Sequence, residues 1–165
     1  MKQELKQLSV RTIIVAIIAS VYAALTIAVG SLGYSFIQIR IGEALTPLPF
    51  SMGFSAVAGL TIGCVIANFS SPIGIVDLIF GSLLTLLAAL MSWKLSFNRK
   101  ILACIYPVLI NAFGVSLYVS IFYGVPYLVS VLTILISESI AAILIGYPLL
   151  VSIDRFIRRS SNGKQ

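Results

Sequence analysis

Long apolar runs decide what kind of fold this chain can adopt. Residues 12–29 and 78–91 contain no charged side chain, and a helix that crosses a bilayer needs about 20 mostly apolar residues. Only 10% of the 165 residues are charged, whereas soluble domains have about 25%. The sequence therefore predicts an all-α, polytopic protein of the cell membrane, with residues 1–165 forming a single membrane domain.

The composition excludes several kinds of chemistry. Histidine is absent, which removes the commonest metal ligand and the commonest general base at neutral pH. Cys64 and Cys104 lie in apolar segments and belong to no metal or redox motif. The phosphate-binding pattern G-x-x-x-x-G-K-[ST] does not occur. We therefore expect no metal, no cofactor and no ATPase activity, and a membrane enzyme is the weakest alternative.

The basic residues predict the topology. Ten of the eleven lie in three clusters, and cytoplasmic loops carry an excess of Lys and Arg. With all three clusters in the cytoplasm, the number of spans between neighbouring clusters must be even. The clusters are Lys2, Lys6 and Arg11, then Lys94, Arg99 and Lys100, and finally Arg155, Arg158, Arg159 and Lys164.

This rule predicts six helices and cytoplasmic termini. The stretch 42–69 is about 42 Å long as helix, and it has to enter the membrane and return. We expect two short helices that meet near Met52 and Gly53, because short helices are tolerated where they line a protein cavity. The predicted helices are 9–30, 42–53, 55–69, 77–96, 100–122 and 127–153, followed by a basic cytoplasmic tail at 154–165.

One acidic residue falls in the middle of a predicted span. Glu138 lies about eleven residues into the last helix, and a carboxylate at that depth is costly and usually functional or paired. It is either a protonated side chain that bonds a neighbouring helix, or a group that contacts a ligand or carries a proton.

Other polar residues near the membrane allow two interpretations each. Glu43 follows Arg40 by three residues, so the two form a structural ion pair or contact a polar ligand. Asp77 begins a helix and either caps it or binds a ligand. Asn68 and Asn111 need partners in an apolar setting, which helix backbones or a ligand could provide.

On the predicted topology these residues converge. Arg40, Glu43, Asn68 and Asp77 fall near the outer face, with Glu138 and Asn111 below them. We expect a polar pocket that opens outward and suits a small planar molecule with amide-like groups.

Helix one carries rows of small residues. Such rows let helices approach closely within lipid, and they serve either internal packing or docking to another membrane subunit. One row contains Ala16, Ser20, Ala24 and Ala28, and an adjoining row contains Ala19 and Ala23.

One stretch resembles a known family signature. Residues 37–49, Ile-Gln-Ile-Arg-Ile-Gly-Glu-Ala-Leu-Thr-Pro-Leu-Pro, resemble the Q-[FI]-R-[IV]-[SG]-E-A-L-x-x-L-P stretch of the QueT family. Further matches follow in order at 63–68, 71–72 with Asp77, Asn111, 124–126 and Glu138. Ser137 departs from the pattern, in which glycine is expected before the glutamate.

The resemblance implies a function. QueT proteins are substrate-binding S-components of energy-coupling factor transporters for queuosine precursors, which contain a 7-deazaguanine (preQ0, preQ1 or queuine). Their six-helix fold has a capping loop between helices one and two, where Arg40 would lie. The implied partners are a transmembrane coupling subunit, which would contact the small residues of helix one, and two ATPase subunits.

The resemblance also suggests roles for individual residues. A carboxylate can accept both adjacent donors of the deazaguanine, N1–H and the N2 amino group, and an amide or guanidinium can serve O6. Glu138 is assigned to the donor edge, with Glu43 or Asp77 as the fallback. Arg40 and Asn111 are candidates for O6, and Asn68 and Gln38 are further contacts.

Two alternatives remain open from the sequence. An S-component for another vitamin would share the scaffold and differ in the pocket. A stand-alone carrier could couple transport to protons through Glu138, although no internal repeat of the kind common in such carriers is evident.

Overall fold

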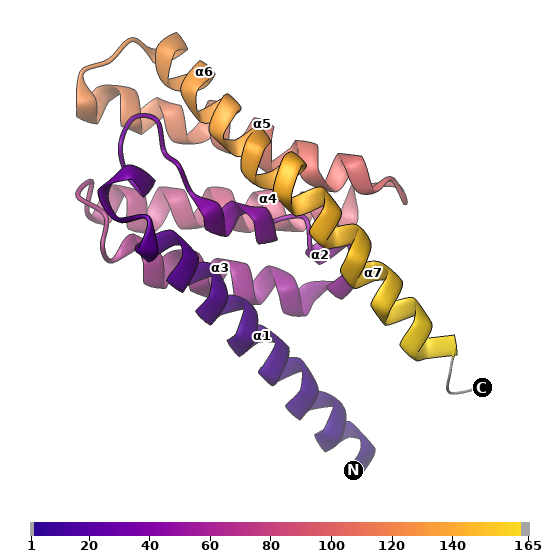
Figure 1. The fold of residues 1–165 in the computed structure, drawn as a ribbon. Coiled ribbons are helices and arrows are strands. Elements are labelled where there is room, and N and C mark those ends of the chain that lie inside the picture. Colours follow the sequence, from indigo (N-terminus) through magenta and orange to yellow (C-terminus); the bar gives the residue numbers. More distant parts are fainter. Residues whose placement is uncertain (1, 163–165) are drawn as a thin grey trace.

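The computed structural model describes residues 2–162, and over these residues the chain forms helices and no strands (Figure 1). Lys164 of the predicted tail lies outside the described residues, as do the side chains of Lys2 and Lys6. The α-helices are α1 (Lys2–Ala28), α2 (Pro49–Met52), α3 (Phe54–Asn68), α4 (Ser82–Lys94), α5 (Lys100–Tyr123), α6 (Tyr127–Glu138) and α7 (Gly146–Asn162).

Four irregular helical turns complete the fold. Two are 3₁₀ turns between α1 and α2, namely η1 (Gly30–Gly33) and η2 (Ile41–Leu45). Two are π turns: η3 (Asp77–Gly81) leads into α4, and η4 (Ser139–Ile145) joins α6 to α7. With these turns counted as parts of the helices they extend, the described residues form the six helices predicted from the sequence.

Some helix ends differ from the predicted bounds. The first helix begins at Lys2 rather than at residue 9, and the last continues to Asn162 rather than ending at 153. The prediction followed the apolar residues, but backbone hydrogen bonding continues a helix into water once its membrane part has formed.

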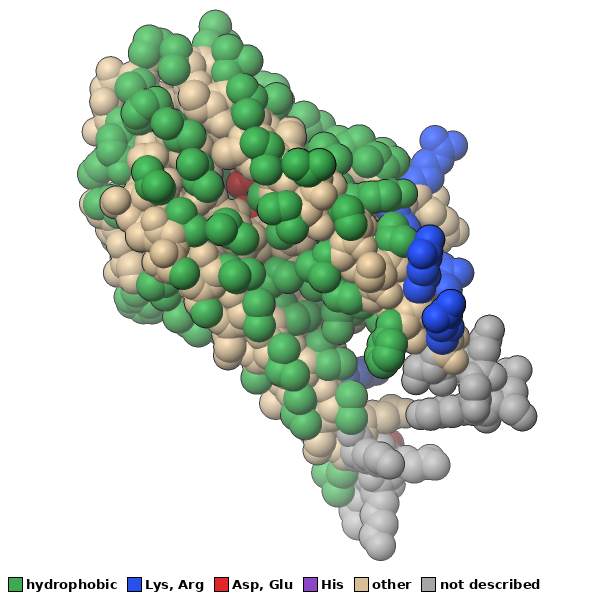
Figure 2. All heavy atoms as spheres, in the orientation of Figure 1, with side chains coloured by type: hydrophobic (Ala, Val, Ile, Leu, Met, Phe, Trp, Pro, Cys, Tyr) green, Lys and Arg blue, Asp and Glu red, His purple; other side chains and the backbone are tan. Residues whose placement is uncertain are grey.

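Among the described residues, four helices are long and apolar enough to cross a membrane, so the chain is a membrane protein. They are Gln7–Ala28, Asp77–Lys94, Lys100–Tyr123 and Tyr127–Arg159. The 15 residues of α3 span about 22 Å, less than the hydrocarbon core of about 30 Å. Both described ends of the chain lie toward the same end of the molecule (Figure 1), and Lys and Arg side chains gather at that end (Figure 2).

Helices α1 and α3 pack with their backbones in close contact. A Cβ atom at Gly63 would lie 2.7 Å from the carbonyl oxygen of Ala19, and one at Gly59 would lie 2.8 Å from the Cβ atom of Ile18. Small residues permit such approach in membrane helices, where van der Waals packing drives association.

This packing separates the two small-residue rows of α1. Ala19 and Ala23 are buried against the rest of the chain. Ala16, Ser20 and Ala24 are exposed. The expectation that both rows contact another subunit is therefore corrected for Ala19 and Ala23, which are used in internal packing.

The segment between α1 and α2 passes through the body of the protein. Its 3₁₀ turn η2 is packed between α1 and the last helix. A Cβ atom at Gly42 would lie 2.3 Å from Thr26 Oγ1, and one at Gly146 would lie 2.7 Å from the carbonyl oxygen of Ala44. These close contacts hold the polar residues of the segment among apolar helices.

A substitution at Gly63 tests the α1–α3 contact. Gly63→Val places a side chain against the α1 backbone, and overpacking of this kind destabilises by roughly 1–3 kcal/mol. We expect a lower melting temperature of the purified chain in detergent. Ala24→Val adds comparable bulk to the exposed face of α1 and should leave the melting temperature unchanged. Equal effects of the two substitutions would contradict this packing.

Candidate ligand-binding site

Arg40 is the centre of a buried polar cluster. Only 4% of its surface is exposed, and its Nη2 donates a hydrogen bond of 2.6 Å to Asn68 Oδ1. The guanidinium also lies over the Tyr34 ring, 5.8 Å from the centroid, at a distance where a cation–π attraction operates. Arg40 thus connects the segment between α1 and α2 to α3.

Asn68 continues this network to the start of the fourth helix. Its Nδ2 donates to the backbone carbonyl of Asp77 at 2.9 Å, which supplies a partner to a carbonyl at the start of a π turn. Of the two carboxyl oxygens of Asp77, Oδ2 has no hydrogen-bond partner among the described residues. Its Oδ1 accepts a hydrogen bond of 2.7 Å from Tyr118 on α5, so the capping role considered from the sequence does not describe its contacts.

Glu43 and Glu138 form the other part of the cluster. The Tyr22 hydroxyl on α1 donates to Glu43 Oε1 at 2.5 Å. The Asn111 amide on α5 lies near the carboxyl groups of both Glu43 and Glu138 and interacts with both. Two carboxyl groups from η2 and α6 therefore meet at one amide, and 1% and 2% of their residues' surfaces are exposed.

Several buried polar atoms in the cluster have no partner among the described residues. Buried polar groups are nearly always hydrogen-bonded, because an unsatisfied one costs about 1–3 kcal/mol or more when charged. The unpartnered atoms that belong to predicted site residues are Gln38 Nε2, Arg40 Nε, Glu43 Oε2, Asp77 Oδ2 and Glu138 Oε2. Two of these atoms are donors and three are acceptors. They suit a ligand that carries both hydrogen-bond acceptors and donors.

Gln38 is held in an unusual backbone conformation. Its φ angle is +48°, in the left-handed region that disfavours residues with a Cβ. Only 1% of its surface is exposed. Strained residues that persist in a fold tend to occur at functional sites, and the buried Gln38 side chain carries a donor, Nε2, that has no partner among the described residues.

The cluster is closed, which differs from the outward-opening pocket expected from the sequence. The segment 34–37 lies over it and is held by three hydrogen bonds from α5 and α6. Tyr123 donates to the Tyr34 carbonyl at 2.7 Å, Thr133 to the Phe36 carbonyl at 3.0 Å, and Ser137 to the Ile37 carbonyl at 3.0 Å. The sequence could not show this closure, because each bond joins residues about 90 to 100 positions apart.

The structure brings the predicted residues together from five elements. Hydrogen bonds link Arg40 to Asn68 and Asn68 to Asp77. Asn111 interacts with Glu43 and Glu138, and the Arg40 guanidinium interacts electrostatically with Glu43 and Asp77. Gln38 precedes Arg40 by two residues in the same segment. The balance of charge is three carboxyl groups to one guanidinium.

Sequence reasoning did not single out Tyr22 or the π turns. Tyr22 is fully buried, and its only signal was a hydroxyl-bearing ring inside an uncharged apolar helix. The π turns begin at Asp77 and directly after Glu138. Such turns often occur at functional sites, but no residue pattern in the sequence predicts them.

A family model described as QueT transporter matches residues 12–155, which is most of the chain. The chain belongs to the QueT transporter family. The resemblance of residues 37–49 is thereby confirmed, and the family makes the chain a transport protein, rather than an enzyme, with a small-molecule substrate. No curated protein and no solved structure matches the chain.

Membership in the QueT family gives the closed cluster a context. In a transport protein, buried donors and acceptors without partners are expected where a solute binds. The signature stretch supplies Gln38, Arg40 and Glu43, which are all buried in the cluster.

Loss of the Asn68 side chain tests the connection between the two halves of the network. Asn68→Leu removes the acceptor of Arg40 and the donor to the Asp77 carbonyl. Leaving a buried charged donor unsatisfied costs about 3 kcal/mol, so we expect a clearly lower melting temperature in detergent. Gln7→Leu makes a similar change at an exposed position of α1 and should have little effect. A stable Asn68→Leu protein would contradict the role of this amide.

Proposed function

We propose that this chain is the substrate-capture subunit, or S-component, of an energy-coupling factor transporter and that it binds a queuosine precursor. The observation that carries the proposal is the pair of free oxygens, Glu43 Oε2 and Glu138 Oε2, beside Asn111 in a member of the QueT family. A 7-deazaguanine presents adjacent N–H donors on one edge and an acceptor at O6. The cluster has free groups of both kinds.

In this proposal Glu138 accepts N1–H and the N2 amino group of the base. Glu43, which also interacts with Asn111, is the fallback for the same edge. Asp77 is a further fallback, but its Oδ1 is already engaged by Tyr118. A carboxylate that accepts two donors in a fork gives both affinity and orientation.

O6 of the base needs a donor in the same cluster. Arg40 and Asn111 are the proposed donors, with Gln38 as a further contact through its free Nε2. Asn68 is engaged by Arg40 and the Asp77 carbonyl, so its part is to position Arg40. Tyr34 and Tyr118 lie in contact with Arg40 and Asp77 and could cover the face of a planar base.

The segment between α1 and α2 would act as the cap of this site. Release of the three hydrogen bonds that hold residues 34–37 to α5 and α6 would open the cluster, and their formation over a bound base would enclose it. With the basic end in the cytoplasm, as the positive-inside rule predicts, the cap faces outward and both termini lie inside.

Energy would come from partner subunits. We propose that the exposed row of Ala16, Ser20 and Ala24 docks on a transmembrane coupling subunit, which in turn binds two ATPase subunits. The row is small enough for close helix approach, and it lies on the exposed face of α1 that adjoins the buried row of Ala19 and Ala23.

Carboxylate-to-amide substitutions test the ligand assignment. Glu138→Gln and Glu43→Gln each exchange an acceptor oxygen for a donor, and loss of a charged hydrogen bond should weaken binding of a 7-deazaguanine about tenfold to a hundredfold. The measurement is a binding titration of purified protein with the nitrile, the aminomethyl form, queuine and guanine. Glu4→Gln makes the same change near the start of α1 and should bind as wild type.

Wild-type affinity in both Glu138→Gln and Glu43→Gln would exclude these carboxylates from base recognition. Binding of an unrelated vitamin, identified by mass spectrometry of the purified protein, would keep the S-component function and change the substrate. Substrate uptake into vesicles that hold this chain without any ATPase would support a stand-alone carrier instead.

The docking face can be tested independently of ligand binding. Ala24→Leu puts a large side chain in the exposed row, so we expect the variant to bind ligand normally and to lose copurification with the coupling subunit. Ser152→Leu enlarges an exposed residue of α7 and should preserve the complex. Copurification of Ala24→Leu at the wild-type level would place the interface elsewhere.

A further inference from the structure

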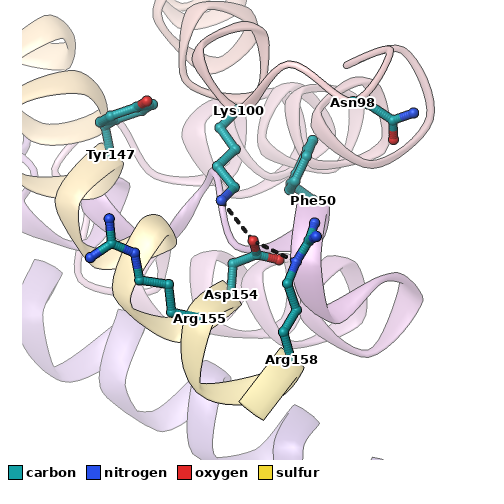
Figure 3. A pocket seen from close by; sticks show the side chains of 7 residues that line it. All are labelled: Phe50, Asn98, Lys100, Tyr147, Asp154, Arg155 and Arg158. Atoms are coloured by element: carbon teal, nitrogen blue, oxygen red, sulfur yellow. Dashed lines mark ion pairs between the residues drawn. The ribbon is translucent and has the colours of Figure 1, made fainter. Parts of the chain in front are cut away.

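A second polar site lies at the basic end of the molecule, away from the cluster described above. It is a depression of about 760 Å³, a volume within the range of small-molecule sites. Its walls come from α2, the loop before α5, the first turn of α5, and α7 (Figure 3). The lining residues are Phe50, Asn98, Lys100, Tyr147, Asp154, Arg155 and Arg158.

The charges of this depression are organised by Asp154. Its Oδ2 pairs with Lys100 Nζ at 2.6 Å and with Arg158 Nε at 3.1 Å, and its Oδ1 accepts from Ser51 Oγ at 3.1 Å. One buried carboxylate thus holds two cationic side chains in place. The pairs neutralise only one of their two positive charges.

Arg155 adds a further positive charge. No carboxylate lies within ion-pairing distance of it among the described residues. Figure 3 shows Arg155 extending from α7 on the side of Tyr147, apart from the Lys100–Asp154–Arg158 group. The lining therefore carries three cationic groups and one carboxylate, which leaves a net charge of +2 facing the depression.

The first turn of α5 strengthens this positive field. Lys100 is the first residue of α5, and Arg99, which precedes it, makes no side-chain cap bond. The unpaired N–H groups of a first helical turn and the helix dipole favour an anion at this end. The anion would lie where Lys100 and Arg155 can both reach it.

The depth of the depression indicates the source of that anion. Lys100 opens the span Lys100–Tyr123, and Arg155 and Arg158 lie in the last turns of the span Tyr127–Arg159. The depression is therefore at the level where apolar helices meet lipid headgroups. Basic pockets between membrane helices at this level bind anionic headgroups.

Apolar side chains accompany the charged residues of the depression. Phe50 and Tyr147 form part of its wall, and Ile101 and Phe156 nearby on α5 and α7 are exposed. A small hydrophilic anion gains nothing from contact with apolar side chains, whereas the acyl chains of a phospholipid would pack against them. On the adjacent side, Lys94 Nζ lies 3.9 Å from the centroid of the Trp93 ring, a pairing typical of the membrane interface.

We propose that this depression binds the phosphodiester headgroup of an anionic phospholipid. Arg155 is its principal ligand through its free guanidinium, Lys100 is the second, and Asp154 orients Lys100 and Arg158 without contacting the phosphate. The bound lipid would bridge α5 and α7 at the basic end. It would thereby fix the position of α7, which continues through η4 from α6, the helix that ends at Glu138.

The test compares lipids and matched arginine variants in the full-length chain. The melting temperature of purified protein in neutral detergent is measured with added phosphatidylglycerol, with phosphatidylcholine and with inorganic phosphate. A ligand that binds the folded state raises the melting temperature, so we expect a rise with phosphatidylglycerol alone. Arg155→Gln should weaken that effect, with binding reduced about tenfold.

Arg159→Gln is the matched control, because it removes the same charge one turn further along α7 and outside the lining. It should keep the response to phosphatidylglycerol. Native mass spectrometry of bound phosphatidylglycerol gives a second readout, should Arg155→Gln itself change the melting temperature without lipid.

Three results would overturn the proposal. An equal rise with phosphatidylcholine would show no headgroup selectivity, and an equal rise with inorganic phosphate would assign the site to a free anion. Equal losses in Arg155→Gln and Arg159→Gln would show general charge attraction to the basic end rather than a built site. Arg158→Gln is unsuitable here because it also breaks the ion pair with Asp154.

Discussion

The hydrogen bond between Arg40 and Asn68 is the interaction on which the interior of this protein depends. A guanidinium among apolar helices is tolerated only where its donors and its charge are compensated. Arg40 obtains an acceptor from α3, a ring face from Tyr34, and the field of the carboxyl groups around it. Asn68 can serve Arg40 because its other end bonds the backbone at Asp77, so the segment between α1 and α2, α3 and the start of the fourth helix are held as one unit.

Close backbone contacts make this arrangement possible. Gly63 brings α1 against α3, and Gly42 and Gly146 let η2 fit between α1 and the last helix. With the segment that deep in the body, Glu43 meets Glu138 at Asn111. The π turns beside Asp77 and Glu138 alter the local helical register at two of the three places where carboxyl groups enter the cluster. The protein thus separates a closed polar interior from an exposed small-residue row on α1 and a basic end.

Much of this organisation could be predicted from residue types. The apolar runs and the groups of basic residues predicted six helices. The residues of the polar cluster were predicted from the rule that polar groups inside a membrane are rare and usually functional. What could not be predicted were the partners. Asp77 looked like a helix cap, yet it is bonded by Tyr118, and Ser137 looked like a departure from a family pattern, yet it holds the Ile37 carbonyl. These contacts join residues far apart in sequence, and hydropathy and spacing carry no information about them.

The sequence by itself determined that the chain is a helical membrane protein with polar residues set into its spans. It also determined the signature stretch at 37–49, because these are properties of composition and local order. Only the tertiary structure decided that Ala19 and Ala23 are buried while Ala16, Ser20 and Ala24 are exposed. The sequence of a small-residue row does not tell which neighbouring helix, if any, packs against it. The tertiary structure also decided that the polar residues lie in a closed cluster rather than an open pocket. The reason is physical: burial and hydrogen-bond pairing are set by which distant segments come into contact, and that depends on the packing of the whole chain.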